Sequence, residues 1–135
     1  MSHKKKELKR EYRLNPKPMG VFQIRNLVNE KVFLGTSLNL PAILNRHQFQ
    51  LQIGNHPNKV LQAEWNQYGS GNFVFEILDE LTPREDPAYD YKPDLAFLED
   101  WWLEKLEPYG ENGYNEKKKS QEEKLRIIMK STQKE

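Results

Sequence analysis

The strongest constraint on the fold of this chain is a pair of short glycine-containing runs. Gly20-Val21-Phe22 and Phe33-Leu34-Gly35 contain the same kinds of residue in opposite order, and ten residues separate them. Residues 21–26 and 32–36 are β-type runs on either side of a polar turn. The pair therefore predicts a β-hairpin with a loop of several residues. Because side chains alternate along a strand, Phe22 and Ile24 are expected on one face of it.

Capping residues predict two helices after the hairpin. Asn39 can cap the first, with Pro41 in its first turn, and Asn58 can cap the second, which ends at Gly69. Apolar spacing predicts which side chains face the core. These are Ile43, Leu44, His47, Leu51 and Ile53 in the first helix, and Val60, Leu61 and Trp65 in the second.

The rest of the chain alternates between regular elements and loops. Residues 73–78 predict a central strand that completes a three-stranded sheet, and residues 82–94 predict a loop. Apolar periodicity predicts a helix over 95–106. Charged segments at 4–13 and 121–131 predict two further helices outside this body.

Composition is consistent with one domain that carries basic tails. The chain has 135 residues, and we divide it into an N-terminal basic helix or tail at 1–18, a domain at 19–115 and a charged C-terminal helix or tail at 116–135. The domain holds seven Lys/Arg against fourteen Asp/Glu, whereas each tail holds seven Lys/Arg and fewer acids. Basic tails on an acidic body can contact phosphates, or can simply be solvated.

Other bulk features bound the environment of the chain. Cysteine is absent, which excludes disulfides and thiolate chemistry and fits a reducing compartment. No apolar stretch approaches the ~20 residues of a membrane span, and Lys4, Lys5 and Lys6 are not followed by the apolar segment of a secretory signal. A cytoplasmic protein without membrane contact is expected. His3, His47 and His56 are too scattered in sequence to predict a zinc site.

Several motifs in order give the chain a family resemblance. The opening pair resembles the signature of the GIY-YIG nuclease superfamily, and the resemblance extends over roughly residues 19–115. Asn45-Arg46-His47 resembles the family's helix after the second strand, Glu99 with Trp101-Trp102 resembles its metal-binding helix, and Gly113-Tyr114-Asn115 resembles its closing segment. The resemblance implies an α+β fold, with a small three-stranded antiparallel sheet flanked by helices, here with helical N- and C-terminal extensions.

The resemblance also implies a chemistry. In such nucleases one divalent metal ion, held mainly by a glutamate, binds the scissile phosphate while water attacks in line. Tyrosine or histidine handles protons, and an arginine stabilises the transition state. By the resemblance, Glu99 is the candidate ligand of a single Mg²⁺ ion, and the candidate catalytic positions are His47, Arg46, Asn115, Phe22 and Phe33. Without the resemblance, Glu99 is interpreted as a solvated carboxylate on a helix, and His47 is interpreted as a packed core residue.

The chain departs from the family pattern at three positions. Phe22 and Phe33 stand where the signature has tyrosine, and neither ring can donate or accept a proton. Ile43 stands at the position of the catalytic arginine, and Arg46 is the nearest possible substitute. Losing one preorganised charge donor typically lowers a rate by ~10²–10³. The departures therefore predict a degenerate active site with weak or no phosphodiester cleavage.

Three functions remain open on the sequence. The first is nucleic-acid binding, most simply of DNA, by a weak or inactive nuclease relative, in which the candidate contacts are Arg25, Lys4, Lys5, Lys6, Lys117, Lys118 and Lys119. The second is an active Mg²⁺-dependent endonuclease, with His47 as base and Arg46 as cation. The third is a regulatory module that binds a protein partner, which the acidic body and the Tyr-containing loop at 82–94 favour.

Overall fold

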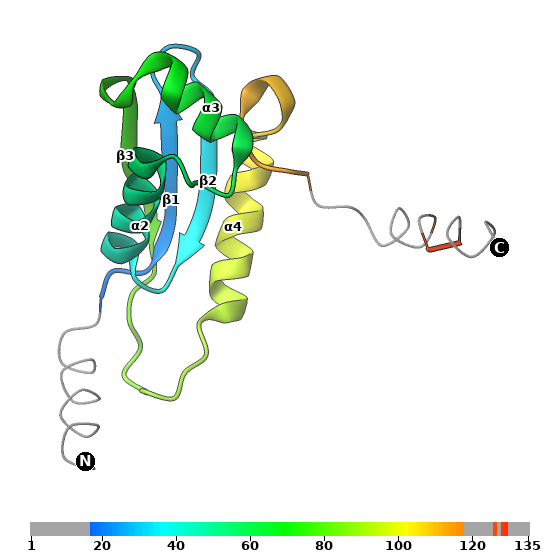
Figure 1. Ribbon diagram of the computed structural model, residues 1–135. Helices are drawn as coiled ribbons and strands as arrows, with labels where there is room; N and C mark the ends of the chain where they lie inside the picture. Colours follow the sequence, from blue (N-terminus) through cyan, green and yellow to red (C-terminus); the bar gives the residue numbers. More distant parts are fainter. Residues whose placement is uncertain (1–16, 118–125, 127, 130–135) are drawn as a thin grey trace.

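The fold is an α+β arrangement of one sheet with helices on both faces (Figure 1). The computed structural model describes residues 17–117, 126 and 128–129. Its strands are β1 (Gly20–Asn26), β2 (Val32–Ser37) and β3 (Phe73–Glu80). Its helices are α2 (Leu40–Ile53), α3 (Lys59–Tyr68) and α4 (Lys92–Leu106), with short 3₁₀ turns η1 (Ser70–Asn72) and η2 (Gly110–Asn112).

The sheet is antiparallel throughout, and its strand order is β2-β1-β3. In the predicted hairpin, Phe22 lies opposite Gly35 and Ile24 opposite Phe33. The α+β class and the three-stranded antiparallel sheet are confirmed. The prediction that residues 73–78 form the central strand is wrong, because β1 pairs on both sides and β3 lies at an edge.

Alternation along the strands divides the core into two clusters. On one face, Ile24 packs with Leu51 of α2 and with Leu61 and Trp65 of α3. On the other face, Val21 and Leu34 pack with α4 through Leu103 and half-buried neighbours that include Leu98 and Trp102. Figure 1 shows α2 and α3 in front of the sheet and α4 beside β2. Any site formed by α2 and α3 therefore lies on the opposite face from the core of α4.

The capping predictions are confirmed by hydrogen bonds. The Asn39 side chain accepts from the backbone N–H of Ala42, and the Asn58 side chain accepts from that of Leu61. Gly54 ends α2 in the left-handed conformation that glycine adopts without strain.

Three details of the predicted elements are wrong. Apolar spacing places Ile53 and Val60 in the core, but they are 55% and 54% exposed, in the last turn of α2 and the first turn of α3 respectively. Helix α4 begins at Lys92 rather than 95, because Pro93 is favourable in the first turn of a helix. The loop before it is correspondingly shorter than 82–94.

The charged segments at both ends are not placed by this structure. The predicted helix over 4–13 lies outside the described residues, as do most residues of the predicted helix over 121–131. The division at 18 and 115 therefore stays a prediction. In the described part of the chain, no helix combines the length and the apolar character needed to cross a bilayer.

Candidate functional site

Two phenylalanine rings and two histidine rings form a cluster between the sheet and α2. The His47 ring centroid lies 5.3 Å from that of Phe22 and 5.4 Å from that of Phe33. His56 meets Phe33 edge-on at 5.8 Å and lies 4.9 Å from His47. The structure thus brings together three sequence-predicted site residues, Phe22, Phe33 and His47, and adds His56.

Hydrogen bonds fix the two histidines relative to each other. His47 Nδ1 lies 2.7 Å from His56 Nε2, and His56 Nδ1 accepts from the backbone N–H of Asn58 at 3.0 Å. The backbone N–H of His56 donates to the Gln62 side chain, whose own amide donates to the carbonyl of Leu51. Because His56 is only 2% exposed, its orientation is set by the fold rather than by solvent.

The environment of the cluster keeps both imidazoles neutral at neutral pH. Burial, followed by the proximity of His56 and of the Arg46 guanidinium, lowers the pKa of His47 from 6.5 to about 4. Burial also lowers the pKa of His56. A proton on the buried His56 ring would have to be accommodated among apolar rings with little access to water.

The low pKa of His47 predicts that acid destabilises the fold. Between pH 6.5 and 4 the unfolded chain holds a proton on His47 that the folded chain does not, so the free energy of unfolding falls as pH falls through this window. The effect is about 3.5 kcal/mol at most, at about 1.4 kcal/mol per pKa unit, and solvent screening of the partly exposed ring makes it smaller. Urea unfolding across this range measures it.

The variant His47→Phe serves as the control for this pH dependence, because it keeps an aromatic ring and removes the titrating group. Its unfolding free energy should change less than that of the parent chain between pH 6.5 and 4. Equal pH dependence in the two proteins would show that His47 does not carry the effect.

The cluster opens into a concave site that we call the His pocket. It has a volume of about 630 Å³. Its walls come from β2, α2, the start of α3 with the loop before it, and η2 with the segment that follows it. The residues that line it are Phe33, His47, His56, Pro57, Asn58, Lys59, Val60, Gly110, Gly113, Tyr114, Asn115 and Glu116.

The segment with Tyr114 and Asn115 forms one wall because it is tied to the sheet. The Asn115 side chain exchanges two hydrogen bonds with the backbone of Leu34, at 2.9 and 2.8 Å, much as a further strand would. The Tyr114 hydroxyl hydrogen-bonds to Glu64 and to Asn26. Burial, together with the bond to Glu64, raises the pKa of Tyr114 above its ordinary value. Tyr114 is therefore a neutral structural donor at neutral pH.

Three further positions of the predicted site, Glu99, Ile43 and Arg46, do not line the His pocket. Glu99 is half-buried on α4, which packs on the opposite face of the sheet, and it is not among the residues that line the pocket. Ile43 and Arg46 lie on α2, half-buried and exposed respectively. Their predicted roles in catalysis and metal binding stay predictions.

Two of the predicted nucleic-acid contacts, Arg25 and Lys117, lie within the described residues. The Arg25 guanidinium pairs with Glu76 at 2.8 Å and with Glu30 at 3.0 Å. Lys117 lies at the end of the described domain, beside α4. The remaining candidates, Lys4, Lys5, Lys6, Lys118 and Lys119, lie outside the described residues.

The possible metal ligands among the described residues suit only an ion that takes part of its coordination from water and substrate. Among the residues that the structure describes, no three His, Asp or Glu side chains are grouped to hold a metal. Mg²⁺ often binds through one or two protein carboxylates and fills its other positions with water and phosphate oxygens. Glu99 could supply such a carboxylate, so a substrate-completed ion fits the residues present and an all-protein cage does not.

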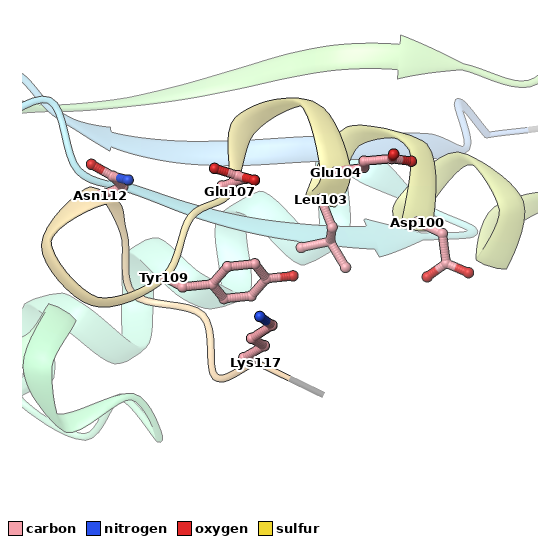
Figure 2. Close-up of a pocket in the computed structure, with 7 residues that line it drawn as sticks. All are labelled: Asp100, Leu103, Glu104, Glu107, Tyr109, Asn112 and Lys117. Carbon is pink, nitrogen blue, oxygen red and sulfur yellow. The ribbon is translucent and has the colours of Figure 1, made fainter. Parts of the chain in front are cut away.

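A second concave site lies beside α4. Its volume is about 520 Å³, and its lining is Asp100, Leu103, Glu104, Glu107, Tyr109, Asn112 and Lys117. Figure 2 shows Leu103, Tyr109 and Lys117 gathered beside the helix. Acidic side chains at three of its seven lining positions make it a poor site for phosphate.

Sequence reasoning missed two members of the His pocket that bear on chemistry. His56 lies nine residues after His47, in the break between two helices, and no local pattern marks it as a partner. Lys59 follows the Asn58 cap and was not distinguished from other surface lysines. One signal was available in the sequence. His56 and Lys59 lie on either side of Asn58, the predicted start of the second helix, where the chain turns.

Comparisons with known proteins agree with this fold. No protein-family model matches the chain. Among curated proteins, it is 33% identical over 99 residues to "Intron-associated endonuclease 1" of Enterobacteria phage T4, a match that covers 71% of this chain and 36% of that protein. The chain thus spans about a third of the length of the curated relative.

Solved structures extend the match to the whole of a catalytic domain. The catalytic domain of homing endonuclease I-TevI is 29% identical and superposes with a TM-score of 0.61, over 74% of this chain and 99% of that one. An alanine mutant of the same domain is 28% identical, with a TM-score of 0.60 over 76% and 97% of the two chains. This chain belongs to the GIY-YIG nuclease superfamily. It is a divergent GIY-YIG domain, because Phe22 and Phe33 stand at both signature tyrosines.

Proposed function

We propose that this GIY-YIG domain binds DNA and cleaves phosphodiesters weakly or not at all. One observation carries the proposal. The two signature rings pack around His47 as phenylalanines, so the centre of the cluster offers ring carbons where the family has hydroxyls. Hydroxyl groups at these positions would be the proton-handling groups of the family chemistry.

The His pocket supports the binding half of the proposal. His47 and Asn58 bring polar groups to its wall, and Lys59 adds a cation at the start of α3. A lysine, a neutral imidazole and the N-terminal end of a helix favour an anionic phosphate. Both relatives are endonucleases, which makes DNA the natural class of partner.

The catalytic half of the proposal concerns the metal ion. GIY-YIG endonucleases are generally metal-dependent, and Glu99 is the residue of this chain that would hold a divalent ion such as Mg²⁺. When bound, such an ion supplies Lewis-acid stabilisation of charge on a phosphate. Without the arginine that Ile43 replaces, this chain has no corresponding cation at that position.

The proposal is tested by incubating pure protein with a DNA duplex, single-stranded DNA and RNA, in Mg²⁺ or Mn²⁺. We expect salt-sensitive binding of the duplex with little or no cleavage. Cleavage that Glu99→Ala abolishes and Glu104→Ala preserves would overturn the proposal in favour of an active endonuclease. Glu104 is the matched control, because it is an exposed glutamate on the same helix.

The contribution of the His pocket is measured separately. Lys59→Gln should weaken duplex binding and lower the slope of log affinity against log salt by about 1, whereas Lys92→Gln should leave both nearly unchanged. Absence of any salt-sensitive binding by the parent chain would exclude the DNA-binding function. The alternative of a protein-binding regulatory module would then be favoured.

A further inference from the structure

The two histidines of the His pocket form a directed hydrogen-bond chain that starts at the backbone of Asn58. The Asn58 N–H lies 3.0 Å from His56 Nδ1 and can only donate. His56 Nδ1 must therefore carry a lone pair. In a neutral imidazole the other ring nitrogen then carries the proton, so His56 presents an N–H at Nε2.

The same logic passes to His47. His56 Nε2 and His47 Nδ1 are 2.7 Å apart, a distance that requires one proton between them. His56 supplies that proton, so His47 Nδ1 accepts it. The proton of neutral His47 must then lie on Nε2.

The other tautomer of His47, with its proton on Nδ1, is excluded by the Asn58 N–H at the start of the hydrogen-bond chain. A proton on His47 Nδ1 would need an unprotonated His56 Nε2, which moves the His56 proton to Nδ1. That proton would face the Asn58 N–H at 3.0 Å, donor against donor. The buried His56 ring cannot escape to water, since it is 2% exposed and its backbone is anchored by Gln62.

The free nitrogen of His47 is accessible from the His pocket. His47 Nε2 makes no hydrogen bond with any described residue. Within the same part of the chain, no buried side-chain nitrogen or oxygen lacks a hydrogen-bond partner. Nε2 is therefore in contact with solvent, on the wall of a pocket that also contains Lys59.

We propose that His56 is a positioning residue that fixes the proton of His47 on Nε2, so that His47 presents a hydrogen-bond donor, and not a base, to a phosphate oxygen. The contact with a phosphate rests on the proposed function. The tautomer of His47 rests on the hydrogen-bond chain alone. Phosphate oxygens in a diester are acceptors only, which matches an N–H and mismatches a lone pair.

Nitrogen NMR of the histidine side chains in the full ¹⁵N-labelled chain tests the tautomer without any ligand. At pH 7 we expect His47 Nδ1 to resonate as an unprotonated, hydrogen-bonded nitrogen and His47 Nε2 as a protonated one. His3→Gln and His56→Phe assign the signals. A protonated His47 Nδ1, or a fast average of both tautomers in the parent chain, would overturn the proposal.

His56→Phe also tests whether His56 acts on His47. Phenylalanine keeps a ring edge against Phe33 and removes the donor, so the His47 Nδ1 resonance should move toward that of a free, unbonded imidazole nitrogen. A merely structural role for His56 would leave that resonance unchanged. If the variant fails to fold, the parent spectrum still decides the tautomer.

Addition of a short DNA duplex tests the phosphate arm separately. Contact with a phosphate oxygen should shift the His47 Nε2 resonance while Nδ1 stays unprotonated. A duplex that binds and leaves Nε2 unmoved overturns the donor role alone. A duplex that does not bind at all overturns the proposed function. The tautomer of His47 is decided independently, by the spectrum of the protein without DNA.

Discussion

Gly20→Ala is expected to lower the free energy of unfolding by about 3 kcal/mol or more. Gly20 has φ +155°, a conformation that residues with a Cβ rarely adopt, and a Cβ built there would lie 2.0 Å from the backbone carbonyl oxygen of Asp79. Asp79 belongs to β3, which pairs with β1 at this point, so relief would require the two strands to separate. Strain and loss of strand pairing together account for a change of this size.

The matched control for Gly20→Ala is Gly71→Ala. Gly71 lies in η1, and a Cβ there would meet nothing within 4 Å. Its effect should stay within about 0.5 kcal/mol, as for most surface substitutions. Urea unfolding of both variants and the parent gives the comparison. Equal stability of the two variants would contradict the idea that Gly20 is required by the β1–β3 approach.

The signature glycines therefore serve the fold independently of the chemistry. Gly35 shows the same principle in a milder form, because a Cβ there would lie 2.6 Å from Cζ of Phe22. Cζ is the atom that carries the hydroxyl in tyrosine, and it lies directly over the glycine of the neighbouring strand. The contact with Gly35 is made by the carbon atoms of the ring. This explains how the pattern survives in a chain that lacks both tyrosines.

Elements governed by local rules could be predicted from the sequence. The Asn39 and Asn58 caps, the hairpin formed by the two glycine-containing runs and the helix end at Gly69 each depend on a few neighbouring residues. The order of strands could not be predicted, because alternation in residues 73–78 is the same for an edge strand and a central one. Only the pairing of β1 on both sides decides it.

The candidate site was predicted in part for the same reason. Phe22, Phe33 and His47 were identified through the family motif, and the fold assembles them. His56 was missed because its partnership with His47 depends on the path of residues 54–58 and on the Asn58 backbone. The relation of Glu99 to this cluster depends on how α4 packs against the sheet, which no spacing in the sequence encodes.

Restoring the family residues together is expected to give the largest change in activity. The combined variant Phe22→Tyr, Phe33→Tyr and Ile43→Arg should raise metal-dependent DNA cleavage by roughly 10²-fold or more over the parent chain. The two hydroxyls would return proton-handling groups to rings whose centroids lie within 5.4 Å of the His47 ring centroid. The arginine would return a cation to position 43 of α2. Cleavage of a labelled duplex in Mg²⁺ and Mn²⁺ measures the change.

Two controls separate chemistry from binding. The same variant with Ile43→Gln in place of Ile43→Arg keeps a polar side chain without the charge and should fall short of the full gain. The same variant with Glu99→Ala should lose the gain if Glu99 holds the metal ion. Duplex affinity is measured in parallel, so that a change in binding is not mistaken for a change in rate.

Stability must be followed as well, because Phe22 is 2% exposed and its new hydroxyl would need a partner. The double variant Phe33→Tyr with Ile43→Arg is the fallback, since Phe33 lines the open His pocket. A folded, DNA-binding variant that cleaves no faster than the parent would show that the lost hydroxyls and guanidinium do not limit the reaction. The predicted metal ligand Glu99 on α4 would then be the next position to test.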